Sequence, residues 1–217
     1  MRIVLISGPA GSGKDAVGEI LRDLMEKNGE KVLVTHYADL IKHVAASFCG
    51  WNGVKDIAGR TILQTVGADV VRNWNEDYWV DFLVNMLTLF GDRYRYVLIP
   101  DARFPNEISK IREKWPDTVH LRVERPGFKS HLTEKQQNHI TETALNGVRP
   151  DVLIQNDGSL EDLTAKTQDF YARLAGDDLL RGIPERLDGQ ITMAEWMRAG
   201  FDEQTARELT ELSEVVL

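Results

Sequence analysis

The chain has 217 residues, which is enough for one globular domain with an appendage and for a core that needs no disulfide or metal. Its composition, 42% hydrophobic and 28% charged, is ordinary for a globular protein. The formal net charge of −8 argues against a protein that coats nucleic acid or lies on a membrane surface, because either role needs a basic face.

Cysteine use and hydropathy suggest where the protein works. The single cysteine, Cys49, excludes an intramolecular disulfide and suits a reducing compartment. No apolar run approaches the length of a membrane helix. The first residues suit a strand and not a signal peptide, so we expect a cytoplasmic protein.

Short apolar runs and amphipathic segments alternate along the chain. Ile3–Ser7 is a branched apolar run that is typical of a buried parallel strand. From Asp15 to Asn28 apolar residues recur at helical spacing, which predicts a helix. Further helices are expected from Leu40, over Ile57–Trp74, over Tyr78–Phe90 and from Ser159 to about Leu174. Further strands are expected at Lys31–Tyr37, Tyr96–Pro100, Thr118–Val123 and Val152–Gln155.

This alternation predicts an α/β protein in three layers, with a five-stranded parallel sheet and helices on both of its faces. Sheets of this kind bind ligands at the carboxyl ends of their strands. Between the last two strands, Glu124–Pro150 is polar and has no apolar stripe. We therefore expect a mobile lid over about residues 125–150.

The end of the chain has a different pattern. We place the main domain at residues 1–175, a linker at 176–190 and a two-helix appendage at 191–217. In the appendage, Thr192 and Glu195 form a capping box, and Asp202 suits the start of a second helix. Two interpretations stay open: a packing or homodimer contact, and a regulatory or partner-binding element.

The stretch GPAGSGKDAV lies between the first predicted strand and the first predicted helix. Gly8, Gly13 and Lys14 satisfy the phosphate-loop pattern G-x-x-x-x-G-K. Backbone N–H groups and the helix N-terminus surround phosphate in such a loop, and Lys14 would reach the outer phosphates. A glycine-rich turn without a ligand is the alternative, and it explains neither the lysine nor the flanking elements. The residues expected at the nucleotide are Gly8, Ala10, Gly11, Ser12, Gly13, Lys14, Asp15 and Ala16.

Asp15 stands where the usual pattern has Ser or Thr, whose hydroxyl contacts magnesium. As an acidic first-turn residue it complements the helix dipole. As a ligand, its carboxylate would hold Mg²⁺ directly or through a water. The two interpretations are compatible. Asp101, at the end of the third predicted strand, has the position of a second magnesium-holding or water-orienting acid, so Asp15 and Asp101 are the predicted metal ligands.

Arginines follow two strand ends at the ligand edge of the sheet. Arg103 is suited to a bidentate clamp on a second phosphate. Arg125 opens the lid, where it would stabilise charge on a transferred phosphoryl group. Asn106 and Glu107 are candidates for hydrogen bonds to a substrate base or sugar. Alternatively, Asp101 starts a turn and Glu107 begins the next helix.

Six stretches together resemble the phage-type deoxynucleoside monophosphate kinases, which are phosphate-loop kinases. They are SGPAGSGKDAVGEIL, YADLIKHVA, LQTVGADVVRNWNEDYWVDFL, VLIPDARFPNEI, RVERPGF and HITETALN with DVLIQNDGSLEDL. The resemblance covers about residues 1–175 and not the rest. Members of that family often read G-K-D after the loop, so Asp15 looks like a family trait. The resemblance implies the P-loop kinase fold.

The resemblance also implies roles on the acceptor side. Asp39 and Lys42 would line the acceptor site, with Lys42 near the acceptor phosphate. Arg72 would contact the monophosphate. Trp79 would wall the base pocket, although a core aromatic is the other interpretation.

The remaining motifs support further assignments. The match of DARFPNE favours Asp101, Arg103, Asn106 and Glu107 at the substrate. The match of NDGSLEDL places Asn156 near the donor adenine, although it also suits a residue that only shapes a turn.

These residues lead to one hypothesis: transfer of a phosphoryl group from ATP, bound with Mg²⁺, to a deoxynucleoside 5′-monophosphate. Lys14, Arg103, Arg125 and Asp101 would be catalytic through position and charge, because the acceptor phosphate is already a nucleophile. A kinase for another small phosphorylated acceptor is the second hypothesis, since animal phosphomevalonate kinases also look like G-K-D proteins. A nucleotide-dependent switch is the third, but a switch needs only one phosphate cluster. The base preference does not follow from the sequence.

Overall fold

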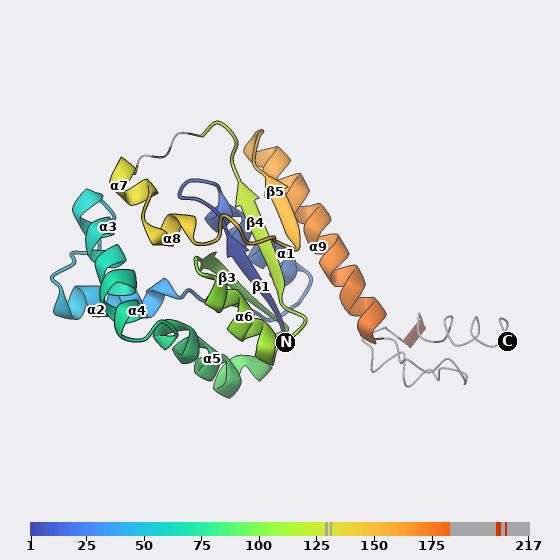
Figure 1. Cartoon of the computed structure of the whole chain (residues 1–217). Helices are drawn as coiled ribbons and strands as arrows, with labels where there is room; N and C mark the ends of the chain where they lie inside the picture. Colours follow the sequence, from blue (N-terminus) through green and yellow to red (C-terminus); the bar gives the residue numbers. More distant parts are fainter. Residues whose placement is uncertain (129, 131, 183–202, 205–206, 208–217) are drawn as a thin grey trace. The chain divides into compact units, whose positions relative to one another are not determined.

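The computed structural model describes residues 1–128, 130, 132–182, 203–204 and 207. Five strands form one parallel sheet in the order β2-β3-β1-β4-β5 (Figure 1). This confirms the predicted class and sheet. The strands are β1 (Arg2–Ser7), β2 (Val32–Val34), β3 (Tyr96–Ala102), β4 (Val119–Glu124) and β5 (Val152–Gln155).

Helices cover both faces of the sheet, and β1 is buried along its whole length. On one face, Ile3 and Leu5 share a core cluster with residues of α5 (Tyr78–Phe90) and α6 (Pro105–Lys114). On the other face, Gly18 of α1 (Lys14–Lys27) lies so close to the sheet that an added Cβ would be 3.3 Å from Pro100. Successive strand residues point to opposite faces, so both layers pack on the same central strand.

The predicted helix over Ile57–Trp74 is present but is not uniform. It consists of α3 (Ile57–Gln64), a π-helical segment (Thr65–Val70) and α4 (Val71–Trp74). Such π segments are rare and are frequent at functional sites. The remaining elements are α2 (Ala38–Phe48), a 3-10 turn (Gly91–Arg93), α7 (Glu134–Gln137), α8 (Ile140–Thr143) and α9 (Leu160–Gly182).

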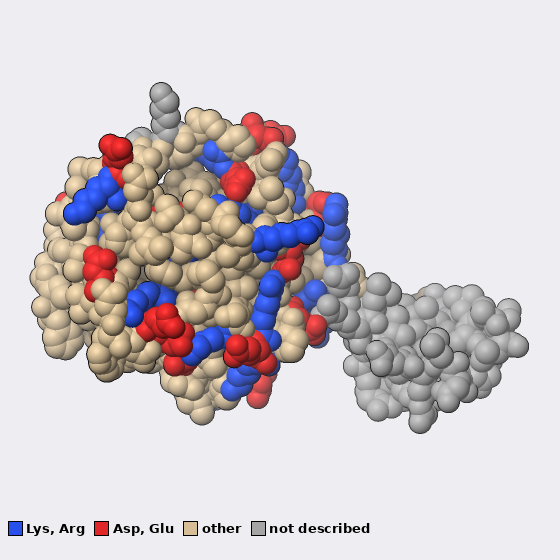
Figure 2. Space-filling model, viewed as in Figure 1, with Lys and Arg blue, Asp and Glu red and all other residues tan. Residues whose placement is uncertain are grey.

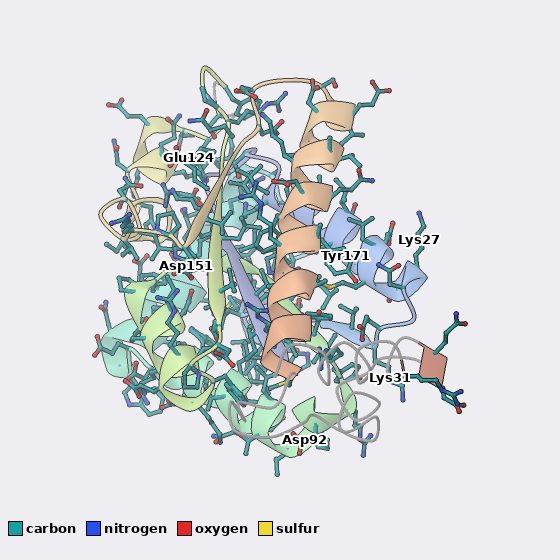
Figure 3. The ribbon with its side chains drawn as sticks, turned by 90° about the vertical axis from the view of Figure 1, so that its right-hand side faces the viewer. Lys27, Lys31, Asp92, Glu124, Asp151 and Tyr171 are labelled. Carbon is teal, nitrogen blue, oxygen red and sulfur yellow. The ribbon has the colours of Figure 1, made fainter. Side chains whose placement is uncertain are left out.

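The strand order fixes the edge at which a ligand would bind. β1 lies between β3 and β4, so the chain leaves β1 toward one side of the sheet and later crosses to the other. The segments that follow β1, β3 and β4 therefore meet at the carboxyl edge of the sheet, where open α/β sheets bind ligands. Figure 3 shows Glu124 at this end of β4, and Asp151 at the opposite end, just before β5.

The predicted lid segment lies between β4 and β5 and contains α7 and α8. Figure 1 shows α7 beside α3. Gln136 of α7 donates a hydrogen bond to the Ile57 carbonyl at 3.1 Å, and His139 Nε2 lies 3.3 Å from Asp69 Oδ1. The segment thus contacts the α3–α4 helix. Its opening and closing stay a prediction.

The C-terminal part differs from the expectation where it is described. α9 extends to Gly182, past the expected helix end at Leu174, so residues 176–182 are helical and not a linker. A single internal glycine such as Gly176 costs a helix only about 1 kcal/mol, which does not stop it. The chain divides into two units after Thr167, and the site below lies in Met1–Thr167. The rest of the predicted linker and most of the 191–217 appendage lie outside the described residues. None of the described helices is long and apolar enough to span a membrane.

Candidate functional site: a phosphate loop and an adjoining cavity

The phosphate loop connects β1 to α1. Gly8 lies so close to β4 that a Cβ atom there would be 2.3 Å from the Val123 carbonyl oxygen. Gly13 has a φ of +99°, which suits glycine, and it precedes α1 without a side-chain hydrogen bond to the first turn. The first N–H groups of the helix are therefore not capped by the residue before it. This is the arrangement in which a helix N-terminus receives a phosphate.

Asn156 follows β5 and supports the loop. Its Nδ2 donates to the Ser12 carbonyl oxygen at 2.9 Å, and the Ser12 N–H donates to the Pro9 carbonyl at 3.1 Å. Ser12 is buried, and its hydroxyl has no hydrogen-bond partner among the described residues. Asn156 therefore shapes the loop; its predicted contact with the adenine stays a prediction.

Lys14 is the first residue of α1 and is 7% exposed. Burial lowers the pKa of its ammonium group, and the positive charge of Arg103 lowers it further. The carboxylates of Asp15, Glu142 and Asp101 act in the opposite direction. A buried ammonium with another cation nearby gains when further negative charge arrives, so Lys14 is suited to hold phosphate.

A cavity of about 340 Å³ lies beside the loop and brings together half of the predicted site residues. Those that line it are Ala10, Gly11, Lys14, Asp15, Lys42, Arg72, Asp101, Arg103 and Glu107. Tyr37 and Ile41 near the start of α2, Gln64 of α3, and Leu132, Thr141 and Glu142 of the lid segment also line it. The loop, the arginines and the lid segment thus share one space.

Asp101 joins β3 to the start of α2. Its Oδ1 accepts the Tyr37 N–H at 3.0 Å and its Oδ2 accepts the Ala38 N–H at 2.9 Å. Burial raises the pKa of this carboxyl, and the two backbone donors and the charges of His36 and Arg103 oppose the rise. Each carboxylate oxygen has a second lone pair, so Asp101 keeps the capacity for one more contact at each oxygen.

Glu107 is the buried centre of the acceptor side, with 2% of its surface exposed. Its Oε1 pairs with Arg72, and its Oε2 accepts the N–H groups of Arg103 at 2.6 Å and Phe104 at 3.1 Å. Burial raises the pKa of Glu107 to about 7, and the charge of Arg72 opposes the rise. Arg72 also stacks on the Phe104 ring, 3.8 Å from its centroid. Glu107 therefore holds the Arg72 guanidinium and the backbone N–H of Arg103, while its direct contact with a substrate stays a prediction.

Arg103 reaches from the end of β3 to the lid segment. Its Nη1 lies 2.7 Å from Glu142 Oε1 and donates to the Thr141 carbonyl oxygen at 3.2 Å. The other oxygen of Glu142 accepts the N–H of Ala10, in the phosphate loop, at 3.2 Å. Sequence reasoning misses Glu142 and Thr141. Their only signal is the family-like stretch HITETALN, which assigns no role to either residue.

Trp79 does not line the cavity. Its side chain is 2% exposed, and its indole N–H donates to the Gly67 carbonyl oxygen at 2.9 Å. Gly67, in the π segment, does line the cavity, so Trp79 supports the wall from within the core. In this structure Trp79 is a core aromatic, and its predicted place in the wall of a base pocket stays a prediction. Helical spacing identifies the apolar stripe of α5 but not which of its residues reach the cavity.

Asp39 and Asn106 lie beside the cavity and not in its wall. Asp39 accepts a hydrogen bond from Lys42 at 2.9 Å and so fixes a cavity residue. Asn106 accepts from Arg72 at 3.3 Å and donates to Asp77 at 2.8 Å. In this structure both side chains contact neighbouring cationic side chains. The predicted contacts of Asp39 and Asn106 with a substrate stay predictions.

Arg125 is also outside the cavity wall. Its guanidinium lies 4.7 Å from the centroid of the Phe128 ring. That ring lies over the phosphate loop, because a Cβ on Gly11 would be 2.3 Å from Phe128 Cε1. The predicted contact between Arg125 and a transferred phosphoryl group stays a prediction.

The fold and the site together define the class. A glycine loop at a helix N-terminus, a buried lysine and arginines in the same cavity are those of a phosphate-loop α/β protein. A family model described as deoxynucleotide monophosphate kinase matches residues 25–167. The chain belongs to this family, which confirms the resemblance drawn from its motifs. The matched residues begin after the phosphate loop. The loop therefore supports the phosphate-loop class independently of the family match.

Curated relatives come from phages. The deoxynucleotide monophosphate kinase of Enterobacteria phage T4 is 34% identical in an alignment of 132 residues, with 56% of this chain and 52% of the relative covered. The protein of the same name from Escherichia phage RB69 is 35% identical in an alignment of 111 residues, with 50% of this chain and 43% of the relative covered. The chain thus spans about half the length of the curated relatives it matches.

Solved structures are more distant. An APS kinase of Mycobacterium tuberculosis, in complex with AMPPNP and APS, has 16% identity and a TM-score of 0.48, with 79% of this chain and 97% of that chain covered. A gluconokinase from Sinorhizobium meliloti 1021 has 18% identity and a TM-score of 0.48, with 83% and 97% covered.

Proposed function

We propose that this chain transfers the γ-phosphoryl group of ATP to a deoxynucleoside 5′-monophosphate. One observation carries the proposal: Lys14 and the N-terminus of α1 share a single cavity with Arg72 and Arg103. A triphosphate on the loop and a monophosphate on the arginines would bring two phosphate groups together in that cavity. A nucleotide-dependent switch would need only the first of these groups. Membership of the family supports the choice of acceptor.

The proposed reaction depends on position and charge. An oxygen of the acceptor phosphate attacks the γ-phosphorus, and the bond between that phosphorus and the β–γ bridging oxygen breaks. The electron pair of that bond leaves on ADP. The attacking oxygen is already ionised, so no general base is needed. Lys14 and the loop N–H groups would hold the β- and γ-phosphates, while Arg72 and Arg103 would hold the acceptor phosphate.

Asp15 and Asp101 are the residues that would hold Mg²⁺ with ATP. Both line the cavity beside Lys14, and Asp15 is exposed. The described residues contain no group of three or more His, Cys, Asp or Glu side chains that could hold a metal. Two carboxylates suit Mg²⁺ nonetheless, because it is commonly held by one or two carboxylates, substrate phosphates and waters. The ion would offset the negative charge of the phosphates.

The segment at about 125–150 would act as a lid that brings Arg125 to the phosphates and excludes water.

The charge distribution on the surface also fits a small nucleotide as the partner. On the face in Figure 2, basic side chains lie among acidic ones, so on that face they form no broad basic area. We place the reaction in the cytoplasm, where its nucleotides occur.

A coupled assay of ADP release tests the function. The chain is supplied with MgATP and, in turn, each deoxynucleoside monophosphate, each ribonucleoside monophosphate and no acceptor. The proposal expects ADP release that depends on a deoxynucleoside monophosphate, with the matching diphosphate as the second product. Equal release without an acceptor would favour the switch. No response to any nucleotide would favour another small phosphorylated acceptor.

A further inference from the structure

We infer that Glu142 is a positioning residue that ties Arg103 to the phosphate loop, so that the guanidinium faces the path of phosphoryl transfer. The inference rests on the proposed function and deepens it. It assigns a role to a side chain of the lid segment that the motif pattern leaves without one.

The two oxygens of Glu142 have separate partners. Oε1 lies 2.7 Å from Arg103 Nη1, and Oε2 accepts the Ala10 N–H at 3.2 Å. The Arg103 Nη1 also donates to the neighbouring Thr141 carbonyl at 3.2 Å, so α8 contacts one nitrogen of the guanidinium twice. The carboxylate is 11% exposed, which keeps water from competing for these bonds. One side chain thus connects the donor side of the cavity to its acceptor side.

The charges around Arg103 show why a second carboxylate is needed. Asp101 lies near enough to interact electrostatically with Arg103, and both residues line the cavity. Without Glu142, Asp101 would be the nearby carboxylate left to attract Arg103, and Asp101 is a predicted metal ligand. The opposing pull of Glu142 holds the guanidinium between the two sides. Asp101 is then left to its two backbone donors.

The contacts of α8 connect this arrangement to the acceptor-side helices. Thr141 Oγ1 accepts a hydrogen bond from Gln64 of α3 at 3.4 Å. His139, before α8, lies 3.3 Å from Asp69 in the π segment. The helix that carries Glu142 is therefore fixed by the same α3–α4 helix that lines the cavity. Displacement of α8 would move Arg103 relative to the loop.

The test compares Glu142→Gln with Glu134→Gln, a matched change of charge at an exposed position of the same segment. Glutamine keeps one oxygen for the Ala10 N–H but loses the charge that holds Arg103. We expect Glu142→Gln to lower kcat about 10- to 100-fold, the range that misplacement of a catalytic group produces. The KM for MgATP should stay within about twofold, and Glu134→Gln should match the wild type in both.

A double-mutant cycle with Arg103→Ala separates positioning from a general structural effect. If Glu142 acts through Arg103, adding Glu142→Gln to Arg103→Ala should lower kcat by less than about twofold more. Wild-type kcat in Glu142→Gln, or losses that simply multiply in the double variant, would overturn the inference. A lower KM for MgATP with unchanged kcat would also overturn the inference, because Glu142 would then only compete with the ATP phosphates for the N–H groups of the loop.

A spectroscopic arm works without any substrate. In ¹⁵N NMR spectra, Glu142→Gln should shift the Ala10 amide and the Arg103 side-chain signals, and Glu134→Gln should shift neither. Unchanged signals would overturn the inference whatever the activity. A wild-type chain that phosphorylates no deoxynucleotide would contradict the proposed function. In that case the shifts still decide whether Glu142 positions Arg103.

Discussion

Acid should destabilise the base of the phosphate loop through His120. His120 of β4 and Ser7 of β1 are both fully buried, with Ser7 Oγ and His120 Nε2 2.7 Å apart. The other ring nitrogen has no hydrogen-bond partner among the described residues. Burial lowers the pKa of His120 to about 4; the charges of Arg112 and Arg122 also lower it, and Asp151 opposes them.

The magnitude follows from the two pKa values of the imidazole. It titrates near 6.5 when unfolded, so between about pH 6.5 and pH 4 the unfolded chain binds a proton that the folded chain does not. The free energy of unfolding therefore falls as the pH falls through this window. The full shift is worth about 3 kcal/mol. At about pH 4.5 we expect roughly 2 kcal/mol, because the titration is incomplete and solvent around Asp151 screens part of the charge.

Urea unfolding at about pH 7 and about pH 4.5 measures this loss. The control is His120→Gln, whose amide can still bond to Ser7 but does not titrate. Carboxylates that are protonated over the same range affect both proteins alike, so the comparison isolates the imidazole. The wild type should lose roughly 2 kcal/mol more than the variant. A difference below about 0.5 kcal/mol would refute the argument that burial keeps His120 neutral.

Three further substitutions probe the loop, the core and the acceptor side. Asn156→Ala removes the hydrogen bond to Ser12. It should lower the free energy of unfolding in urea by about 1 kcal/mol and raise the KM for MgATP several-fold. An unchanged KM would mean that the loop keeps its shape without Asn156. Trp79→Phe should lower stability by about 1–2 kcal/mol through the lost bond to Gly67, while the KM for the monophosphate stays within about twofold; a large KM change would support the base-pocket role. Arg72→Lys loses the planar fork and should raise the KM for the monophosphate about tenfold, with the KM for MgATP unchanged in the same steady-state assay.

Local sequence patterns are sufficient to predict a segment where its structure depends on its own residues. β1 is predictable because a strand buried on both faces reads as an unbroken apolar run. The phosphate loop is predictable because glycines are required where backbone comes close to backbone, as at Gly8, or where φ is positive, as at Gly13. Asp101 and Arg103 follow from the rule that parallel strands present their carboxyl ends at one edge.

Tertiary packing decided the features that the sequence did not reveal. Trp79 lies on the apolar stripe of its helix, but only its contact with Gly67 shows that it supports the cavity wall from behind. Glu142 lies in a four-residue helix, which is too short for a periodic signal. Its partners Arg103 and Ala10 are 39 and 132 positions away in the chain. The π segment has no periodicity of its own, since the residues on either side continue one helix.

The central claim is that Lys14 holds the phosphates of ATP for transfer to a nucleotide in the same cavity. Its most direct test is Lys14→Ala, assayed for diphosphate formation from MgATP and the best deoxynucleoside monophosphate. The account predicts a loss of at least about 10²-fold, with urea stability equal to the wild type or higher, because the buried ammonium lies near Arg103. Near-normal turnover in a folded Lys14→Ala protein would contradict the account.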